Sequence, residues 1–241
     1  MKKIFLYALM LGMTVLGFTS CNDDEDALTD TVVTYYVNLD MQGSSFVEVP
    51  IGTSYTDAGC LATENGEDVT SKIVTTGLDD IDVNVAGLYY VTYSATNKDG
   101  FENSVTRTVA VCDPSITTDI SGSWTTQAGT HRNYYYDDGR VVTTAFPNYS
   151  ISIRRDAPGI FHVSDYLCGY YDQRAGYGSN YAASGYIQLL EDNTLVMLSS
   201  YVPGWGDSLD YFEGTYDPET ETISFYEIYA GSMDFEITLK Q

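Results

Sequence analysis

The chain has 241 residues and carries 34 acidic against 11 basic side chains, a formal net charge of −23. This excess of negative charge repels nucleic-acid phosphates and anionic membrane surfaces, which makes both poor partners. The length is sufficient for two domains of ordinary size.

Residues 1–20 have the pattern of a signal peptide. Two lysines precede an apolar segment, residues 4–18, that is too short to span a bilayer. The six residues that end in Cys21 resemble a bacterial lipobox. The resemblance implies cleavage before Cys21 and acylation of its thiol, so that a lipid anchor holds the protein on a membrane without a spanning helix. An ordinary signal peptide cleaved near Ser20 is the alternative.

Residues 21–30 predict a flexible acidic tether. The run from Asn22 to Asp26 contains only polar and acidic residues and cannot pack into a core. An acidic run directly after the lipidated cysteine resembles the surface-export signal of Bacteroidetes lipoproteins. It implies a lipid-anchored protein of the outer membrane that is exposed on the cell surface, and a plain solvated leader is the alternative.

Residues 31–113 predict an all-β domain. The expected strands are Thr31–Leu39, Ser45–Pro50, 87–96 and Ser104–Val111. The dipeptide Asp99-Gly100 lies between the last two and is a strong signal for a hairpin turn. Alternation along the returning strand places Val105, Val109 and Val111 on one buried face.

Three motifs in this domain carry a resemblance. The segment 55–59 reads Tyr-x-Asp-x-Gly, residues 68–70 read Asp-Val-Thr, and residues 87–95 read Gly-x-Tyr-x-Val-x-Tyr-x-Ala. In this order and spacing, residues 45–112 resemble a bacterial immunoglobulin-like domain of surface proteins, which implies a β-sandwich. Such modules are mostly spacers and presentation units, and the fold implies no activity.

Three cysteines remain beyond Cys21, an odd number. Cys60 and Cys112 could bridge the first and last strands of the first domain, whereas Cys168 would stay single. The spacing leaves the pairing open.

Residues 114–119 predict a short linker, and residues 120–241 predict a second all-β domain. Its expected strands are Val141–Ala145, Tyr149–Arg154, Ile160–Ser164, Gly185–Leu190, Thr194–Ser200, Phe212–Tyr216, Thr222–Tyr229 and Met233–Leu239. Eight short strands separated by turn residues favour an antiparallel β-barrel or a sandwich. The Gly-x-Trp that ends at Trp124 resembles the opening of lipocalin-like barrels.

Aromatic residues distinguish the second domain. It holds 15 of the 22 tyrosines and both tryptophans. The glycine-rich segment 168–185 predicts a long loop. A loop so rich in tyrosine is typical of a binding surface, because tyrosine offers a flat face, a hydroxyl and low side-chain entropy. The candidate ligand-binding residues are Tyr170, Tyr171, Tyr177, Tyr181 and Trp205. The alternative is that these side chains pack onto the barrel and plug its end.

The sequence contains no recognisable catalytic motif. The acidic pairs Asp207/Asp210 and Glu191/Asp192 are of the kind found in glycosidases, but such pairs arise by chance in so acidic a chain. The two histidines, His131 and His162, lie on different segments without a nucleophile motif. We therefore expect no catalytic residues, no metal and no cofactor.

The two-domain arrangement resembles small Bacteroidetes lipoproteins that accompany starch-utilisation-type (SusC/SusD-like) outer-membrane uptake systems. The resemblance implies a surface-exposed lipoprotein that is an accessory binding component for a glycan or an oligopeptide. The alternative is a structural subunit that docks on an outer-membrane transporter and has no small ligand of its own.

Overall fold

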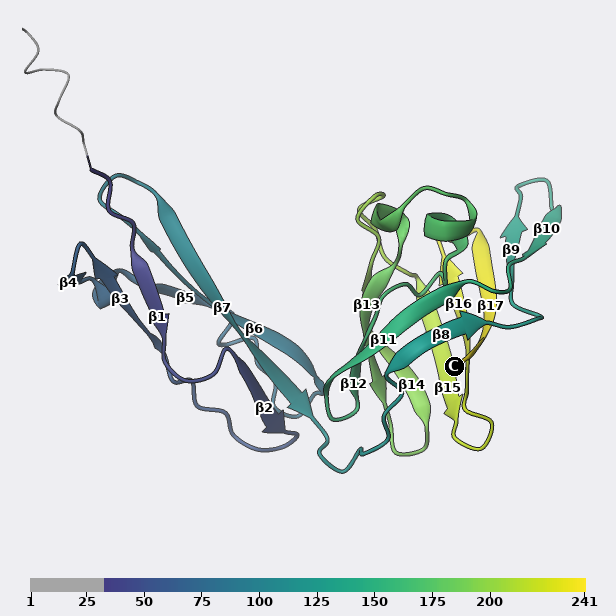
Figure 1. Cartoon of the computed structure of the whole chain (residues 1–241), viewed down its shortest axis with the longest axis horizontal. Helices are drawn as coiled ribbons and strands as arrows, with labels where there is room; N and C mark the ends of the chain where they lie inside the picture. Colours follow the sequence, from purple (N-terminus) through teal and green to yellow (C-terminus); the bar gives the residue numbers. More distant parts are fainter. Residues whose placement is uncertain (1–32) are drawn as a thin grey trace, which may run out of the picture.

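The computed structural model describes residues 33–241, which form two β domains in series (Figure 1). The signal peptide, the lipid anchor expected at Cys21 and the acidic tether lie outside the described residues. Among the residues described, none forms a helix long and apolar enough to cross a membrane.

The first domain is an immunoglobulin-like pair of sheets. One sheet has the order β2-β7-β6-β5 and the other the order β1-β3-β4, and only the β2–β7 pair is parallel. The bounds are β1 Asn38–Met41, β2 Phe46–Pro50, β3 Cys60–Glu64, β4 Glu67–Asp68, the 3₁₀ turn η2 Thr70–Lys72, β5 Val74–Thr76, β6 Gly87–Thr96 and β7 Glu102–Cys112.

The β6–β7 hairpin follows the predicted alternation. Strand β6 has the predicted bounds, and β7 extends the expected strand at both ends. Val109 and Val111 are fully buried in the core of the first domain, and Val105 packs against the same core. The β-branched residues therefore form the inner face of the central hairpin, as period-two patterning requires.

The structure explains the Tyr-x-Asp-x-Gly motif by a buried ion pair. Arg107 of β7 is only 1% exposed, and its guanidinium forms a salt bridge with Asp57. The Asp57 carboxylate also accepts hydrogen bonds from the hydroxyls of Tyr55 and Tyr93 and from the backbone N–H of Gly59. The motif is therefore structural: it supplies the carboxylate that neutralises a buried arginine.

The first expected strand is shorter than predicted. Within Thr31–Leu39, the described residues before Asn38 form no strand. Side-chain amides, and not a neighbouring strand, bond the backbone of this segment: Asn97 donates to the carbonyl of Tyr35, and Asn103 donates to the carbonyl of Val37. A β-branched and aromatic sequence favours a strand only where a neighbouring strand is available to pair with it.

The second domain is an eight-stranded antiparallel barrel. The strands run in the order β8-β11-β12-β13-β14-β15-β16-β17, and β17 pairs with β8 to close the wall. The bounds are β8 Gly122–Thr126, β11 Ser150–Ala157, β12 Ile160–Val163, β13 Ser184–Leu189, β14 Thr194–Tyr201, β15 Tyr211–Asp217, β16 Thr222–Tyr229 and β17 Met233–Lys240.

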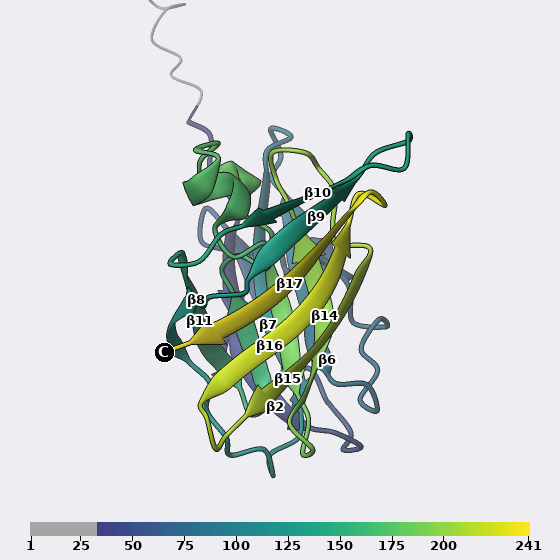
Figure 2. The same ribbon diagram turned by 90° about the vertical axis from the view of Figure 1, so that its right-hand side faces the viewer.

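A hairpin extends beyond the barrel wall. Strands β9 (His131–Tyr135) and β10 (Val141–Ala145) are inserted between β8 and β11, and β9 pairs with the upper part of β17. Figure 2 shows this hairpin projecting past the end of the barrel. Strand β10 pairs only with β9, so its other edge is open within the described part of the chain.

The barrel interior is filled by side chains. Trp124 of β8 is 1% exposed, donates its indole N–H to the carbonyl of Ile120 and meets Tyr216 edge to face. The central cavity, bordered by residues such as Tyr166 and Phe225, has a volume of only about 10 Å³. A space of this size is at the lower limit for one water molecule, so the interior does not enclose an organic ligand.

The cysteines are unpaired and buried in the described structure. Cys60 belongs to the core of the first domain, whereas Cys112 packs with Ala110, Ala157 and Ile160 in a cluster where the two domains meet. The bridge that the sequence left open is therefore absent among these residues. Cys168 is enclosed in the barrel core, where burial raises the pKa of its thiol.

Candidate functional site at the end of the barrel

A lid covers one end of the barrel. It is the connection between β12 and β13, and it contains a π turn, η3 (Tyr170–Arg174), and a 3₁₀ turn, η4 (Ser179–Tyr181). The side chain of Asp165, 2% exposed, holds its two ends together. Its carboxylate accepts backbone N–H bonds from Leu167 (3.0 Å), Gly169 (2.7 Å) and Ala183 (2.8 Å). The segment predicted as a long loop is thus a compact cap.

The structure places Tyr170 and Tyr171 on the inner side of the lid. They are 6% and 9% exposed and belong to the barrel core. The Tyr170 ring packs edge to face against Phe146 and Phe235. The Tyr171 hydroxyl lies 2.9 Å from the sulfur of Met233 and accepts a long hydrogen bond from Arg132. These two tyrosines therefore plug the end of the barrel.

The other three candidates form the outer layer. Tyr177 is 57% exposed and Trp205 is 41% exposed, while Tyr181 is half-buried beside them. The Trp205 ring centroid lies 4.8 Å from that of Tyr181 and 4.8 Å from that of Tyr171. Tyr177 stacks on Tyr171 with centroids 6.0 Å apart. The structure thus brings all five predicted residues into one continuous assembly from two separate loops.

Tyr229 also belongs to this assembly of rings, although the sequence analysis did not single it out. It ends β16, its ring centroid lies 5.8 Å from that of Trp205, and its hydroxyl donates to Asp207 at 2.8 Å. Its pKa is raised by burial and by that carboxylate. The signal was available in the alternation of β16, which places Tyr229 on the same inner face as Phe225. We call Tyr171, Tyr177, Tyr181, Trp205 and Tyr229 the aromatic cluster.

Two glycine-rich loops lock the aromatic cluster in place. The N–H of Gly204 donates to the carbonyl of Asn180 at 2.6 Å and joins the Trp205 loop to the lid. A Cβ atom at position 204 would lie 2.6 Å from the ring of Tyr181 and 2.9 Å from the Asn180 oxygen. The close approach of the two loops therefore depends on glycine, and it fixes the exposed face of Trp205.

Two arginines pack on the same tyrosine at this end of the barrel. The guanidinium carbon of Arg132 lies 4.8 Å from the ring centroid of Tyr170, and that of Arg174 lies 5.1 Å from it. Arg132 also lies over Tyr134, so the rings continue onto the β9–β10 hairpin. The site therefore combines flat aromatic faces with guanidinium groups, which hydrogen-bond ligands and stack on rings.

Beneath the lid, a second carboxyl group lies inside the barrel. Glu227 of β16 is fully buried, and neither of its oxygens has a hydrogen-bond partner among the described residues. Burial, and secondarily the nearby Asp165, raise the pKa of Glu227 well above its usual range. Burial also raises the pKa of Asp165, to about 7, against the effect of its three backbone donors.

Three of the acidic residues considered for hydrolysis accept hydrogen bonds from a side chain or from the backbone. Asp207 accepts from Tyr229, Asp210 accepts the N–H of Gly231, and Asp192 accepts the N–H of Thr194 in its turn.

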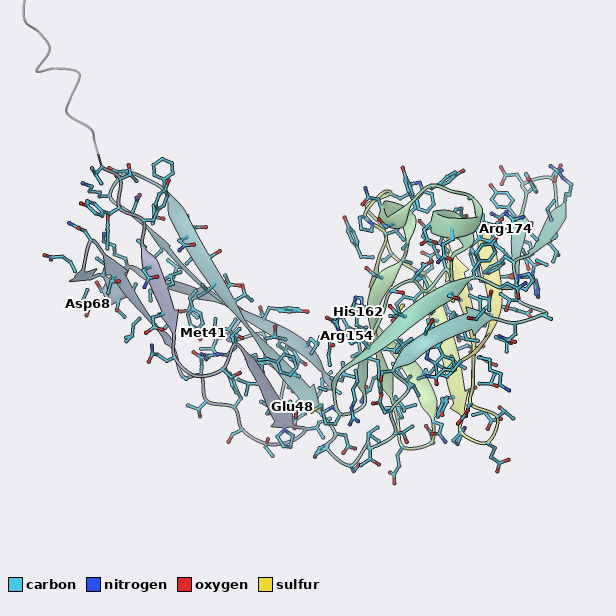
Figure 3. The ribbon with its side chains drawn as sticks, viewed as in Figure 1. Met41, Glu48, Asp68, Arg154, His162 and Arg174 are labelled. Carbon is cyan, nitrogen blue, oxygen red and sulfur yellow. The ribbon has the colours of Figure 1, made fainter. Side chains whose placement is uncertain are left out.

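The histidines are not placed together with those acids. His131 lies on β9, and its ring nitrogen bonds the carbonyl of Gly129. His162 lies on β12 beside Tyr186, on the barrel face turned toward the first domain (Figure 3). No group of three or more His, Cys, Asp or Glu side chains is placed to hold a metal ion in residues 33–241.

A separate open groove of about 850 Å³ lies on the outer face of strands β14–β17. Its lining includes Glu213, Tyr226 and Glu236, which are cross-strand neighbours, and it shares no residue with the aromatic cluster. The groove lacks the locked loops of the barrel end, so we take the aromatic cluster as the candidate site.

In comparisons with known proteins, each of the two domains matches a family model. Residues 39–111 match the family model "Bacterial surface protein, Ig-like domain", and residues 113–241 match a model described as "-like, C-terminal domain". Among solved structures, the lipoprotein BT2262 from Bacteroides thetaiotaomicron is 41% identical over 86% of this chain and 100% of its own, with a TM-score of 0.47.

A further match is the structure of CBM51-2 in complex with GlcNAc and INT domains from Clostridium perfringens ZmpB. It is 14% identical over 85% of this chain and 44% of that chain, with a TM-score of 0.28, a likeness too weak to carry an argument. None of the curated proteins matches the sequence.

Proposed function

Because the chain belongs to the family of the lipoprotein BT2262 from Bacteroides thetaiotaomicron, we propose that it is a surface-exposed lipoprotein anchored through Cys21 in the outer membrane. In this proposal it is a non-catalytic accessory component of a nutrient uptake system. The barrel end binds a glycan or an oligopeptide, and the immunoglobulin-like domain serves as a spacer, in keeping with its match to bacterial surface proteins.

The observation that carries the binding role is the exposed layer of the aromatic cluster. Trp205 and Tyr177 present ring faces at the tip of a rigid barrel, although a soluble domain gains by burying such rings. Both loops are fixed by the Gly204 to Asn180 hydrogen bond, so little conformational entropy is lost when a ligand stacks on the rings. Sugar rings and peptide groups both pack on flat aromatic faces with adjacent hydrogen-bonding groups.

The binding role is tested with the purified chain lacking residues 1–20. Glycan and peptide arrays identify a ligand, and titration calorimetry then compares the wild type with Trp205→Ala and Tyr177→Ala. We expect each substitution to weaken binding by about 1–3 kcal/mol, or roughly 5- to 150-fold. The matched control is Tyr36→Ala, because Tyr36 is 61% exposed on the other domain. Equal binding by all four proteins would remove the aromatic cluster from the site.

The anchor is tested separately in cells. Labelling with a clickable palmitate analogue should mark the wild type and not Cys21→Ser. Protease added to intact cells should then remove the wild-type protein from the surface. Labelling of Cys21→Ser, or protection of the wild type from protease, would contradict the proposed localisation.

One observation favours the alternative role as a docking subunit. Strand β10 (VVTTA) has one edge without a pairing strand in residues 33–241, no charge and no proline, and Val141 and Val142 are 49% and 36% exposed. Natural proteins usually protect such edges, because unpaired backbone groups recruit strands from other chains. Stable co-purification of a transporter from detergent extracts, lost in Thr143→Pro and kept in Trp205→Ala, would favour docking over ligand binding.

A further inference from the structure

The arginines of this protein differ in the partners of their guanidinium groups. All six lie in the described residues. Four are tied to a carboxylate or a carbonyl: Arg107 to Asp57, Arg140 to Asp138, Arg154 to Asp156 and Arg155 to the Ile116 oxygen. Arg132 and Arg174 form no ion pair among these residues, although the chain has 34 acidic side chains that could supply one.

Both of these arginines stack on Tyr170. Their guanidinium carbons lie 4.8 and 5.1 Å from its ring centroid, so they are at most about 10 Å apart, a span that a ligand of several sugar residues covers. Figure 3 shows Arg174 at the end of the barrel that carries the lid and the β9–β10 hairpin.

The hydrogen-bonding capacity of the pair is almost unused. A guanidinium has five N–H donors. Arg132 makes one long bond, 3.4 Å to the Tyr171 hydroxyl, and its buried Nε has no partner. The Arg174 side chain makes no hydrogen bond within residues 33–241. Asp172 lies on the same turn but pairs with neither guanidinium, and its buried Oδ1 also lacks a partner.

The pair is continuous with the exposed rings. The Tyr170 centroid lies 4.9 Å from that of Tyr171, which lies 4.8 Å from that of Trp205. The row links Trp205 to the ring on which both guanidiniums stack, and Arg174 is itself exposed, so a ligand of several sugar residues can contact both Trp205 and Arg174. Carboxylates more than about 8 Å away act weakly here, because at physiological ionic strength charges separated by that distance are screened. Asp172, on the same turn as Arg174, and Asp207, bonded to Tyr229, are the acidic groups at the site itself.

We propose that the ligand of the barrel end is an anionic oligosaccharide, whose carboxylate groups are bound by Arg132 and Arg174 while a neighbouring sugar ring stacks on Trp205. This inference rests on the proposed binding function and names its ligand class. The planar guanidinium fork matches a carboxylate in two parallel hydrogen bonds, which selects an acidic sugar residue over a neutral one. The aromatic layer supplies the sugar contact that an isolated anion site lacks.

Titration calorimetry with three probes tests the proposal: hexagalacturonate, maltohexaose as a neutral hexasaccharide, and hexaglutamate as an acidic peptide. We expect hexagalacturonate to bind best. The double variant Arg132→Gln/Arg174→Gln should weaken its binding by about tenfold or more, the usual effect of losing a charged hydrogen bond. The matched control Lys240→Gln removes an exposed cation at the end of β17 and should change binding less than twofold.

The outcomes separate the two proposals. Maltohexaose binding that is lost in Trp205→Ala and unchanged in the arginine variant would overturn the anionic ligand and leave the aromatic site standing. Hexaglutamate binding more tightly than hexagalacturonate would overturn the sugar class. Equal losses in the arginine variant and in Lys240→Gln would overturn the local site in favour of general electrostatics. If no probe and no array member binds, the binding function itself fails.

Discussion

The buried carboxyl of Glu227 makes the stability of the barrel depend on pH. Its neighbours across the sheet are Phe212 and Phe235, and neither carboxyl oxygen has a partner among the described residues. Because burial raises the pKa of Glu227 well above its usual range, the group is protonated in the folded protein where it would be ionised in the unfolded chain. Glutamine has the same shape and no charge, so Glu227→Gln removes the titration and keeps the packing.

The direction and size of the change in stability with pH follow from the linkage between proton binding and folding. Between the unfolded-state pKa of about 4.3 and the raised folded-state pKa, the folded protein binds one more proton than the unfolded chain. The free energy of unfolding therefore falls as the pH rises, by about 1.4 kcal/mol per pH unit for this group. The contribution of this group is fully present below the unfolded-state pKa and is lost as the pH rises toward the raised pKa of the folded state. Asp165, whose pKa is raised to about 7, also makes the free energy of unfolding fall as the pH rises.

Urea denaturation between pH 5 and pH 8, followed by tryptophan fluorescence, measures this effect for the barrel alone. Both tryptophans, Trp124 and Trp205, lie in the second domain. We expect Glu227→Gln to be more stable than the wild type at pH 8 and to show a smaller slope of stability against pH. Glu236→Gln, on the exposed face of β17, is the control and should keep the wild-type slope. An unchanged slope in Glu227→Gln would refute the reasoning.

Three further predictions concern the first domain, the lid and the cluster. Asp57→Asn leaves the buried Arg107 without its counter-charge and should cost about 3–5 kcal/mol, seen as faster hydrogen exchange of β6 and β7. Asp165→Asn places a donor against the N–H of Gly169, so amides of the lid should exchange about 30-fold faster, equivalent to about 2 kcal/mol, while the barrel strands keep their protection. Gly204→Ala forces the Tyr181 ring away and should shift the emission of Trp205 and abolish ligand binding; unchanged emission would show that the loops can adjust.

Most of the strands could be predicted from the sequence. Strands β6, β10 and β16 have the predicted bounds, because their alternating patterns lie between clear turn residues such as Asp99-Gly100. The sequence predicted a barrel or a sandwich, and only the pairing of β17 with β8 distinguishes them. That pairing joins residues more than a hundred positions apart, and no local pattern encodes it.

The sequence identified most residues of the candidate site but could not predict how they are arranged. The density of tyrosine marked the lid and Trp205, yet composition cannot tell which rings face the core. Tyr170 and Tyr171 point inward because the π turn begins there, and the turn depends on the Asp165 hub, which a periodicity argument does not detect. Tyr229 and Arg132 lie on other segments, so only the folded structure brings them to the lid, whose own η3 turn carries Arg174.

The filled interior decides what kind of ligand the protein can select. A barrel with a large cavity encloses a small molecule and limits its size, whereas here the space below the lid is about 10 Å³ and is lined by side chains such as Phe225. In the proposed function, recognition therefore occurs on the rim, where Trp205 and Tyr177 form an exposed surface. An open surface gains affinity from repeated contacts along a chain, and it sets no limit on the length of that chain. The architecture therefore favours a segment of an oligomer over a free monomer, and we expect galacturonate, titrated in the same way, to bind more weakly than hexagalacturonate.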